Sequence, residues 1–315
     1  MIPACVYDFG RNERFLGDFV SDKRSEVVVA TKYTCNTAAV LESDKRFNPN
    51  FGENYRKSVV ENLNESLKRL NMSYVDILYV YFYEYRTPIE EIMRSLDNVV
   101  RSGKVLYVGI SDTPYWALTR ANTIAELRGW SPFIGLQSHY NLLDRSLEFD
   151  LQPACVELDV VIIPWSIVAD GFITGRRTNE SIADITDYRT QTIANYSKYE
   201  QNWKVLNEVF DISKEIDGSP LQVALNLTRQ KPGITSPLIN AKNLTQLEEN
   251  LKSLEFKLSP EQMRKLDHVS QSTGREVPFP YSITNILDGY IGKNIQVPNK
   301  FASIMTTTNK YGRLC

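Results

Sequence analysis

Several features are scarce or missing in this chain of 315 residues, and each absence excludes a class of protein. No apolar run approaches the roughly 18 residues that a membrane helix requires, so no membrane partner is expected. Residues 1–10 lack the basic and apolar regions of a secretion signal. No basic stripe is visible and the formal net charge is -2, so we expect no nucleic-acid partner.

Cysteine and histidine are also scarce. The four cysteines are Cys5, Cys35, Cys155 and Cys315. They lack the spacing of metal ligands, so no metal site is expected, and without a secretion signal they are expected to be free thiols in a reducing, cytoplasmic compartment. Of the two histidines, His268 falls on an amphipathic stretch and is expected at the surface. His139 lies just past a predicted strand and fits either a functional or a structural role.

Short apolar runs alternate with amphipathic stretches along most of the chain. The runs predict six strands, at residues 27–31, 75–80, 105–110, 133–137, 160–165 and 235–239. Helical spacing predicts helices over residues 54–70, 88–103, 113–129, 147–158, 199–216, 220–230, 244–254 and 260–269. Strands that are apolar on both faces are typical of a buried parallel sheet, either doubly wound or closed into a barrel. No Gly-x-Gly-x-x-Gly follows any strand, which disfavours a doubly wound dinucleotide-binding domain.

Polar residues gather where the predicted strands end, which is where a β/α barrel carries its chemistry. These residues are Lys32, Tyr81 with Glu84, Ser111 with Asp112, Gln137 with His139, Trp165 with Ser166, and Asn240 with Lys242. Lys32 closes an apolar run, and a lysine amine lowers its pKa readily when buried, although such a lysine can also extend its amine to solvent. Trp165 fits either a core position or stacking on a flat ring.

Six segments resemble, in the same order, parts of the aldo-keto reductase family. They cover residues 6–17, 29–32, 66–80, 103–114, 164–166 with 171–175, and 236–250. Residues 111–114 and 128–133 are most similar to the aryl-alcohol dehydrogenase branch. The resemblance implies an α/β fold, a (β/α)8 TIM barrel of the aldo-keto reductase type over residues 1–271, followed by an irregular tail over residues 272–315.

The resemblance also implies a reaction and a set of catalytic residues. In this family a tyrosine is the general acid towards a carbonyl, a lysine assists it, and a nicotinamide cofactor carries the hydride. Tyr7 is the implied acid, Lys32 is the cation expected to lower the pKa of its phenol, and Tyr81 occupies a third catalytic position.

The implied cofactor is NADP(H). The residues implied to bind it are Ser111, Asp112, Gln137, Trp165, Ser166, Gly171, Ile173, Gly175, Lys242, Gln246 and Asn250. Among these, Trp165 would stack on the nicotinamide ring. Lys242 would pair with the 2′-phosphate, which favours NADP(H) over NAD(H).

The chain departs from the family pattern at several positions. Ile2 stands where the family has an aspartate five residues before Tyr7, and Tyr81 stands where it has a histidine. Asn240 and Asp170 take places where glycine is usual. The family's first strand, first helix and most of its second strand have no counterpart, so an upstream segment is expected, because a barrel without that arc exposes two strand edges.

Two functions therefore stay open. One is an NADPH-dependent reductase of an aldehyde or ketone, aromatic ones included, that also runs in reverse on the alcohol. The alternative is a catalytically impaired relative that binds NADPH without turnover, and Tyr81 favours it. In both, the expected partner is a small-molecule carbonyl or alcohol, with residues 35–53 and 176–198 as the longest candidate substrate loops.

Overall fold

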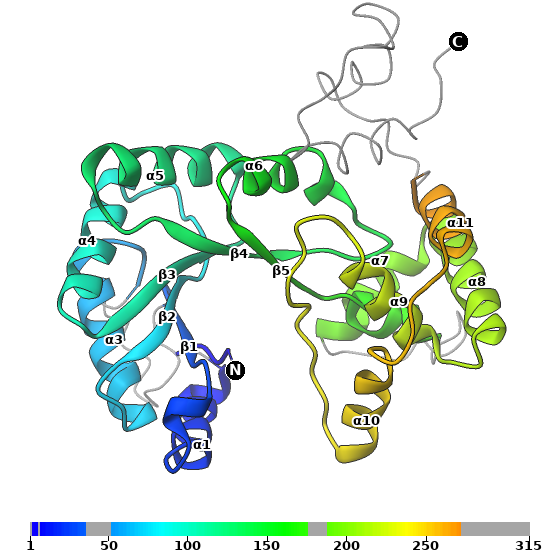
Figure 1. The fold of residues 1–315 in the computed structure, drawn as a ribbon, viewed down its shortest axis with the longest axis horizontal. Coiled ribbons are helices and arrows are strands. Elements are labelled where there is room, and N and C mark those ends of the chain that lie inside the picture. Colours follow the sequence, from blue (N-terminus) through cyan, green and yellow to red (C-terminus); the bar gives the residue numbers. More distant parts are fainter. Residues whose placement is uncertain (1, 6, 36–51, 176–187, 272–315) are drawn as a thin grey trace, which may run out of the picture. The chain divides into compact units, whose positions relative to one another are not determined.

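The computed structural model describes residues 2–5, 7–35, 52–175 and 188–271 (Figure 1). The chain divides into two compact units. The first unit is Met1–Gln137 with Leu158–Val160, and the second unit is Ser138–Glu157 with Val161–Cys315. The predicted tail and parts of both candidate substrate loops lie outside the described residues. No helix in the described ranges combines the length and apolarity that crossing a membrane requires.

Five strands form one sheet in the order β1-β2-β3-β4-β5. They are β1 Ala30–Tyr33, β2 Val75–Val80, β3 Val105–Ser111, β4 Phe133–His139 and β5 Val161–Trp165. The pairs β1–β2, β2–β3 and β3–β4 are parallel, as the sequence predicts. The α/β class is therefore confirmed, and the boundary between the two units falls within β4, after Gln137.

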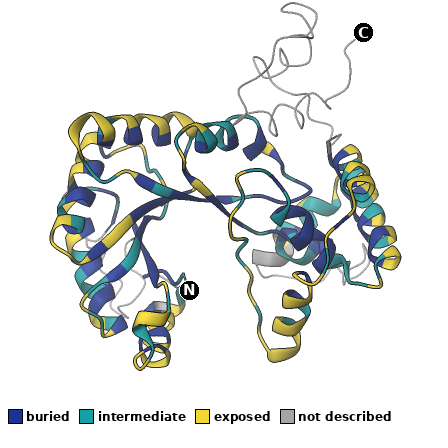
Figure 2. Cartoon of the chain, viewed as in Figure 1, coloured by how far each residue is buried: buried dark blue, intermediate teal, exposed yellow. Residues whose placement is uncertain are grey.

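The described residues of the first unit also form helices and 3-10 turns, several of which flank strands β1 to β3 in Figure 1. They are η1 Tyr7–Gly10, α1 Arg11–Phe19, η2 Arg24–Glu26, α3 Arg56–Leu70, α4 Ile89–Arg101 and α5 Tyr115–Arg128. Pro114 precedes α5, and Gly129 ends it in the left-handed region at φ 62°, a conformation that glycine adopts without strain. The inner faces of these helices are buried, as Figure 2 shows.

The second unit is mainly helical and has a separate apolar core. Its helices are η4 Ser146–Glu148, α6 Leu151–Glu157, η5 Ala169–Thr174, α7 Tyr188–Ser197, α8 Glu200–Glu215, α9 Pro220–Arg229, α10 Leu244–Lys252 and α11 Pro260–Gln271. Val205, Val209 and Leu266 from α8 and α11 are fully buried in this core. Ser219 and Gln222 form a reciprocal capping box at the start of α9, which fixes where that helix begins.

Two predicted elements are wrong. Residues 235–239 form no strand. Their neighbour Ile234 makes a single parallel bridge to Ile162, and Leu238 donates its N–H to the Pro164 carbonyl at 2.9 Å. Pro237 lies between these contacts and has no N–H, so a continuous ladder cannot form.

The helix predicted over residues 147–158 is split into η4 and α6. Pro153 falls in the first turn of α6, the part of a helix that tolerates a missing N–H. The 3-10 turn η4 therefore ends before α6 begins. In addition, β1 starts three residues later than predicted, and α1 was not predicted from periodicity at all.

Candidate active site

The register of the parallel strands brings predicted site residues onto one face of the sheet. Lys32 is the partner of Tyr79, and Ser111 is the partner of Gln137. Side chains alternate along a strand, so Tyr81, two residues beyond Tyr79, lies on the same side as Lys32. The same alternation places Ser111 and Gln137 on that side, so residues from the ends of four predicted strands share one face of the sheet.

Two side chains donate hydrogen bonds to the hydroxyl oxygen of Tyr7. Lys32 Nζ donates a hydrogen bond to it at 3.4 Å, and the Tyr81 hydroxyl donates a second one at 3.3 Å. The Tyr7 and Tyr81 rings meet edge to face, with centroids 6.1 Å apart. Because both neighbours act as donors, the Tyr7 proton itself remains available to an outside acceptor. Both bonds are longer than a typical hydrogen bond, which is common before a substrate closes the site.

Lys32 is a buried amine whose pKa lies below its ordinary value. Only 2% of its surface is exposed. Burial lowers its pKa to about 8, and the Asp112 carboxylate opposes this shift. The ammonium also lies 5.0 Å from the ring centroid of Tyr7 and 5.5 Å from that of Tyr81, within the range of cation–π attraction.

The expected lowering of the Tyr7 pKa is wrong for this structure. Burial raises the pKa of Tyr7, and the hydrogen bond from Tyr81 offsets only part of that shift. The loss of hydration around the phenolate thus has a larger effect on the Tyr7 pKa than the hydrogen bond from Tyr81. Burial also raises the pKa of Tyr81. Both phenols therefore keep their protons at neutral pH, and Tyr7 is held in the form that a proton donor needs.

Asp112 is the carboxylate whose charge acts on this group of side chains. It raises the pKa values of Lys32 and of Tyr7. Ile2, at the position where the family has its aspartate, cannot supply such a charge. Asp112 follows β3 directly and has a φ of 39°, in the left-handed region that is strained for residues other than glycine.

Two residues predicted to bind the cofactor carry buried polar atoms that have no partner among the residues that the structure describes. Gln137 Nε2 and Ser166 Oγ make no hydrogen bond within the described part of the chain. Ser166 also has a left-handed φ, of 59°. A buried polar atom without a partner is unfavourable, so a ligand that supplies one is bound more readily. Amide and hydroxyl groups suit the amide and ribose of a nicotinamide nucleotide.

Trp165 is held by His139, a residue whose role the sequence left open. The two rings meet edge to face, with centroids 4.8 Å apart. His139 Nδ1 lies 3.7 Å from Asp144 Oδ2, and its Nε2 lies 3.4 Å from the Tyr196 hydroxyl. The signal that pointed to His139 was its place just past a strand end.

Gly171, Ile173 and Gly175 use their backbone N–H groups within their own turn. The N–H groups of Gly171 and Ile173 donate to the Val168 carbonyl at 2.9 and 3.2 Å, and that of Gly175 donates to Phe172 at 3.0 Å. The Ile173 side chain is fully buried in the core of the second unit. Cofactor contacts by these residues stay a prediction, and they would have to use other atoms.

Lys242, Gln246 and Asn250 order the segment that leads into α10. Gln246 Oε1 accepts from the Lys242 N–H at 2.8 Å, and the Gln246 N–H donates to Asn243 Oδ1 at 2.9 Å. Asn250 Nδ2 donates to the Asn240 carbonyl at 3.4 Å. The Lys242 side chain is exposed at the helix N-terminus, a position that favours anions.

A known protein family matches most of the chain. Residues 3–271 match the aldo/keto reductase family. An NADP(+) aryl-alcohol dehydrogenase of Phanerodontia chrysosporium is 33% identical over 286 residues, which cover 88% of this chain and 73% of that protein.

Two further relatives are fungal oxidoreductases. A norsolorinic acid reductase of Aspergillus flavus is 28% identical, over 84% of this chain and 66% of that protein. A probable aryl-alcohol dehydrogenase of Saccharomyces cerevisiae is 29% identical, over 96% of this chain and 89% of that protein. The extent of the match and the similarity to these relatives lead to one conclusion: the chain belongs to the aldo/keto reductase family.

Proposed function

We propose that this protein interconverts a carbonyl compound and its alcohol with NADP(H), and that Tyr7 transfers the proton. The observation that carries the proposal is the Tyr7 hydroxyl oxygen, which accepts hydrogen bonds from Lys32 at 3.4 Å and from Tyr81 at 3.3 Å. A phenol with two donors on its oxygen is arranged to lose its own proton to a third group. A carbonyl oxygen that gains negative charge is such a group.

The side chains of this site handle the proton, while a bound nicotinamide supplies or accepts the hydride. Tyr7 donates its proton to the carbonyl oxygen as charge develops there. The charge left on the Tyr7 oxygen is then stabilised by the two donors already in place, Lys32 and Tyr81. In the direction of alcohol oxidation the same oxygen takes the proton back. Lys32 acts most strongly below pH 8, because its pKa is about 8 and only the ammonium form offers a full charge.

The residues present fit an NADP(H) nucleotide. Gln137 Nε2 in the first unit and Ser166 Oγ in the second unit are each buried without a partner in the described residues, so each by itself would suit a polar group of the nucleotide. Trp165 would stack on the nicotinamide ring. Lys242 is exposed beside the N-terminus of α10 and would pair with the 2′-phosphate.

An aromatic aldehyde is the substrate class that we propose to test first. The printed names of two relatives describe aryl-alcohol dehydrogenases. In this chain the Tyr7 and Tyr81 rings meet edge to face, and Tyr81 packs in the same way on Phe82 with centroids 5.8 Å apart. A flat aromatic ring can add to such a series of edge-to-face contacts.

The test separates cofactor binding from turnover. NADPH binding is measured by fluorescence titration, and reduction of a substituted benzaldehyde is measured by loss of NADPH absorbance. We expect wild-type protein to bind and to turn over, and Tyr7→Phe to bind with similar affinity while its kcat falls at least about a hundredfold. Full activity in Tyr7→Phe would contradict the proposed role of Tyr7.

A second candidate function is NADPH binding without catalysis. It is favoured by Ile2 and Tyr81, which replace the aspartate and histidine of the family pattern. In that case the titration gives saturable binding while aldehydes and ketones leave the NADPH absorbance unchanged. A wild-type rate above that of Tyr7→Phe would exclude this alternative.

A further inference from the structure

Thr34 has a backbone conformation that a β-branched residue rarely adopts. It lies immediately after β1, two residues beyond Lys32, and its φ is 107°. Such a conformation is strained by about 1–3 kcal/mol and persists only where surrounding contacts fix it. Thr34 is 2% exposed, so those contacts are internal.

The contacts of Thr34 reach the end of the neighbouring strand. Its hydroxyl accepts a hydrogen bond from the Tyr81 N–H at 3.1 Å and donates one to Asn54 Oδ1 at 2.6 Å. The Tyr81 N–H also donates to the Tyr33 carbonyl at 3.1 Å. Thr34 thus joins the strand that carries Lys32 to the residue that donates to Tyr7.

Asn54 extends this connection along the segment after β2. It is fully buried. Its Nδ2 donates to the Phe82 carbonyl at 3.0 Å, and its N–H donates to Glu84 Oε1 at 3.2 Å. The Glu84 carboxylate in turn accepts from the Thr87 N–H at 3.1 and 3.2 Å. The segment is therefore held at Tyr81 and Phe82 by the side chains of Thr34 and Asn54, and at Glu84 by the Asn54 backbone N–H.

We infer that Thr34 and Asn54 are positioning residues that set the Tyr81 hydroxyl on the Tyr7 oxygen. The inference rests on the proposed function and deepens it. In this chain a tyrosine occupies the position of a histidine, and its hydroxyl is at the end of a longer side chain. A small rotation of the Tyr81 backbone moves that hydroxyl far, so the position of the backbone decides whether the 3.3 Å contact forms. The strained backbone of Thr34 is tolerated because it makes this connection.

The test begins with Thr34→Val, which keeps the β-branched shape and removes only the hydroxyl. We expect kcat for aldehyde reduction to fall about tenfold with little change in the affinity for NADPH. Thr34→Ser restores the hydroxyl and should keep activity within about twofold of wild type. The matched control is Thr228→Val in the second unit. Thr228 is also buried, but its hydroxyl donates to the Ala224 carbonyl of its own helix, far from the Tyr7 site in the sequence.

A double-mutant cycle then separates positioning from general destabilisation. If Thr34 acts through Tyr81, Thr34→Val should lower kcat little further in a Tyr81→Phe background, because the hydroxyl that it positions is already absent. A full tenfold loss in both backgrounds would overturn the inference. So would wild-type kcat in Thr34→Val.

A readout without turnover keeps this test independent of the proposed function. Tyrosine rings are labelled with carbon-13, and the Tyr7 and Tyr81 signals are assigned by the Tyr7→Phe and Tyr81→Phe variants. We expect both signals to shift in Thr34→Val and to stay in place in Thr228→Val. Unchanged signals would overturn the inference even if the protein proves active. Shifted signals in a protein without turnover would support the positioning while refuting the proposed reaction.

Discussion

Lys32 serves the site at the expense of stability. Burial lowers its pKa to about 8, whereas an unfolded chain gives a lysine about 10.4. Below pH 8 the folded state therefore holds a buried charge that it disfavours. Between about pH 8 and 10.4 the unfolded chain binds more protons than the folded one, so this destabilisation fades as the pH rises.

Replacing Lys32 should therefore stabilise the fold and abolish the activity. We expect Lys32→Met to raise the free energy of unfolding by about 1–3 kcal/mol at pH 7, because an apolar side chain of similar length replaces a buried charge. The gain should shrink as the pH approaches 10.4, where the wild-type amine is neutral in both states. Chemical denaturation at a series of pH values measures it.

Aldehyde reduction in Lys32→Met should fall to the level of Tyr7→Phe. Lys242→Met, which removes an exposed lysine from the second unit, is the control for stability and should change the free energy of unfolding little. A Lys32→Met protein that is less stable than wild type at pH 7 would show that the hydrogen bond and ring contacts of Lys32 outweigh its burial.

Tyr81 stands where the family pattern has a histidine, and its hydroxyl donates a hydrogen bond to the Tyr7 oxygen. Tyr81→Phe removes one of the two donors to the Tyr7 oxygen and leaves the ring contacts with Tyr7 and Phe82 in place. We expect kcat to fall about tenfold to a hundredfold, somewhat less than for a full oxyanion donor because the 3.3 Å bond is long. Steady-state kinetics on an aromatic aldehyde measures the change.

Tyr81→His offers the complementary measurement, because it returns the residue type that the family pattern has at this position. If its imidazole reaches the Tyr7 oxygen, kcat should exceed that of Tyr81→Phe. Equal activities of wild type and Tyr81→Phe would mean that Tyr81 has no part in proton transfer.

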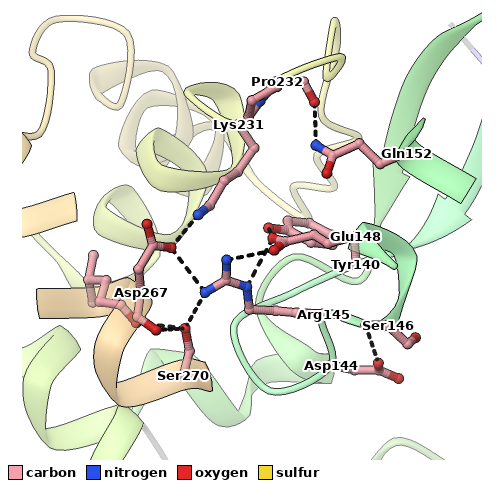
Figure 3. A network of polar contacts seen from close by, with 11 residues as sticks. Tyr140, Asp144, Arg145, Ser146, Glu148, Gln152, Lys231, Pro232, Asp267 and Ser270 are labelled. Atoms are coloured by element: carbon pink, nitrogen blue, oxygen red, sulfur yellow. Dashed lines mark hydrogen bonds and ion pairs between the residues drawn. The ribbon is translucent and has the colours of Figure 1, made fainter. Parts of the chain in front are cut away.

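At the scale of elements, a buried ionic network joins η4, the end of α9 and α11 within the second unit (Figure 3). Arg145 makes a bidentate contact with Glu148, with N–O distances of 2.9 and 2.7 Å, and its third nitrogen contacts Asp267 at 3.0 Å. Lys231 also pairs with Asp267. Burial would raise the pKa of Glu148, but Arg145 and Lys231 hold it below its ordinary value.

Breaking this network on one side should strongly destabilise the protein. Arg145→Met leaves Glu148 and Asp267 without their shared cation, and we expect a loss of about 3–5 kcal/mol. Replacing Glu148 as well, in Arg145→Met with Glu148→Leu, should recover part of that loss, because one uncompensated charge is then removed. Urea denaturation of the single and double variants measures both, and a double variant that is less stable than Arg145→Met would contradict this explanation.

The network also predicts acid sensitivity. A carboxyl with a lowered pKa contributes stability above its unfolded pKa, about 4.3 for glutamate, and that contribution is lost as the pH falls through the folded value. Wild-type protein should therefore lose more stability than the double variant when the pH is lowered below about 4.3. Equal losses would mean that Glu148 is not the group responsible.

Elements were predictable from sequence where local signals agreed with the fold. Pro114 and Gly129 bracket α5, and both are visible as helix signals in the sequence. Pro237 is equally visible, but the apolar residues around it outweighed it, so a strand was predicted where the backbone forms a single bridge. Thr34 gave no signal, because its strained φ and its hydrogen bonds depend on residues far away in the chain.

At the scale of the whole molecule, the sequence indicated the α/β class and the parallel strands but not the division into two units. Apolar runs that alternate with amphipathic stretches indicate strands buried on both faces. The boundary between the units lies within β4, where the amino-acid composition does not change. The direction in which the Tyr7 pKa shifts could not be predicted from the sequence either, because it depends on the balance between burial and hydrogen bonding. The sequence did predict polar residues at the strand ends. The structure shows that one of their atoms, Gln137 Nε2, is buried without a partner in the described residues.

This buried atom gives a prediction about the stability of the whole protein. A ligand that binds only the folded state stabilises it by about 2.7 kcal/mol when present at 100 times its Kd, so NADPH should raise the melting temperature. Gln137→Leu removes a buried amide nitrogen without a partner in the described chain, so the free variant should be at least as stable as wild type. Its NADPH-induced shift should nevertheless be smaller. A variant that is as stable as wild type without NADPH, but is stabilised less by NADPH, has lost a group that binds the nucleotide and not one that supports the fold.

The control is Ser95→Ala on α4, which removes another buried hydroxyl that lacks a partner among the described residues. It too should leave the free protein at least as stable as wild type, but its NADPH-induced shift should equal that of wild type. Thermal melts with and without NADPH measure both quantities. If Gln137→Leu and Ser95→Ala shift equally with NADPH, Gln137 does not bind the nucleotide, and the match between its buried amide and the nicotinamide is a coincidence of packing. If Gln137→Leu alone loses part of the shift, the unpaired amide has its partner in the cofactor.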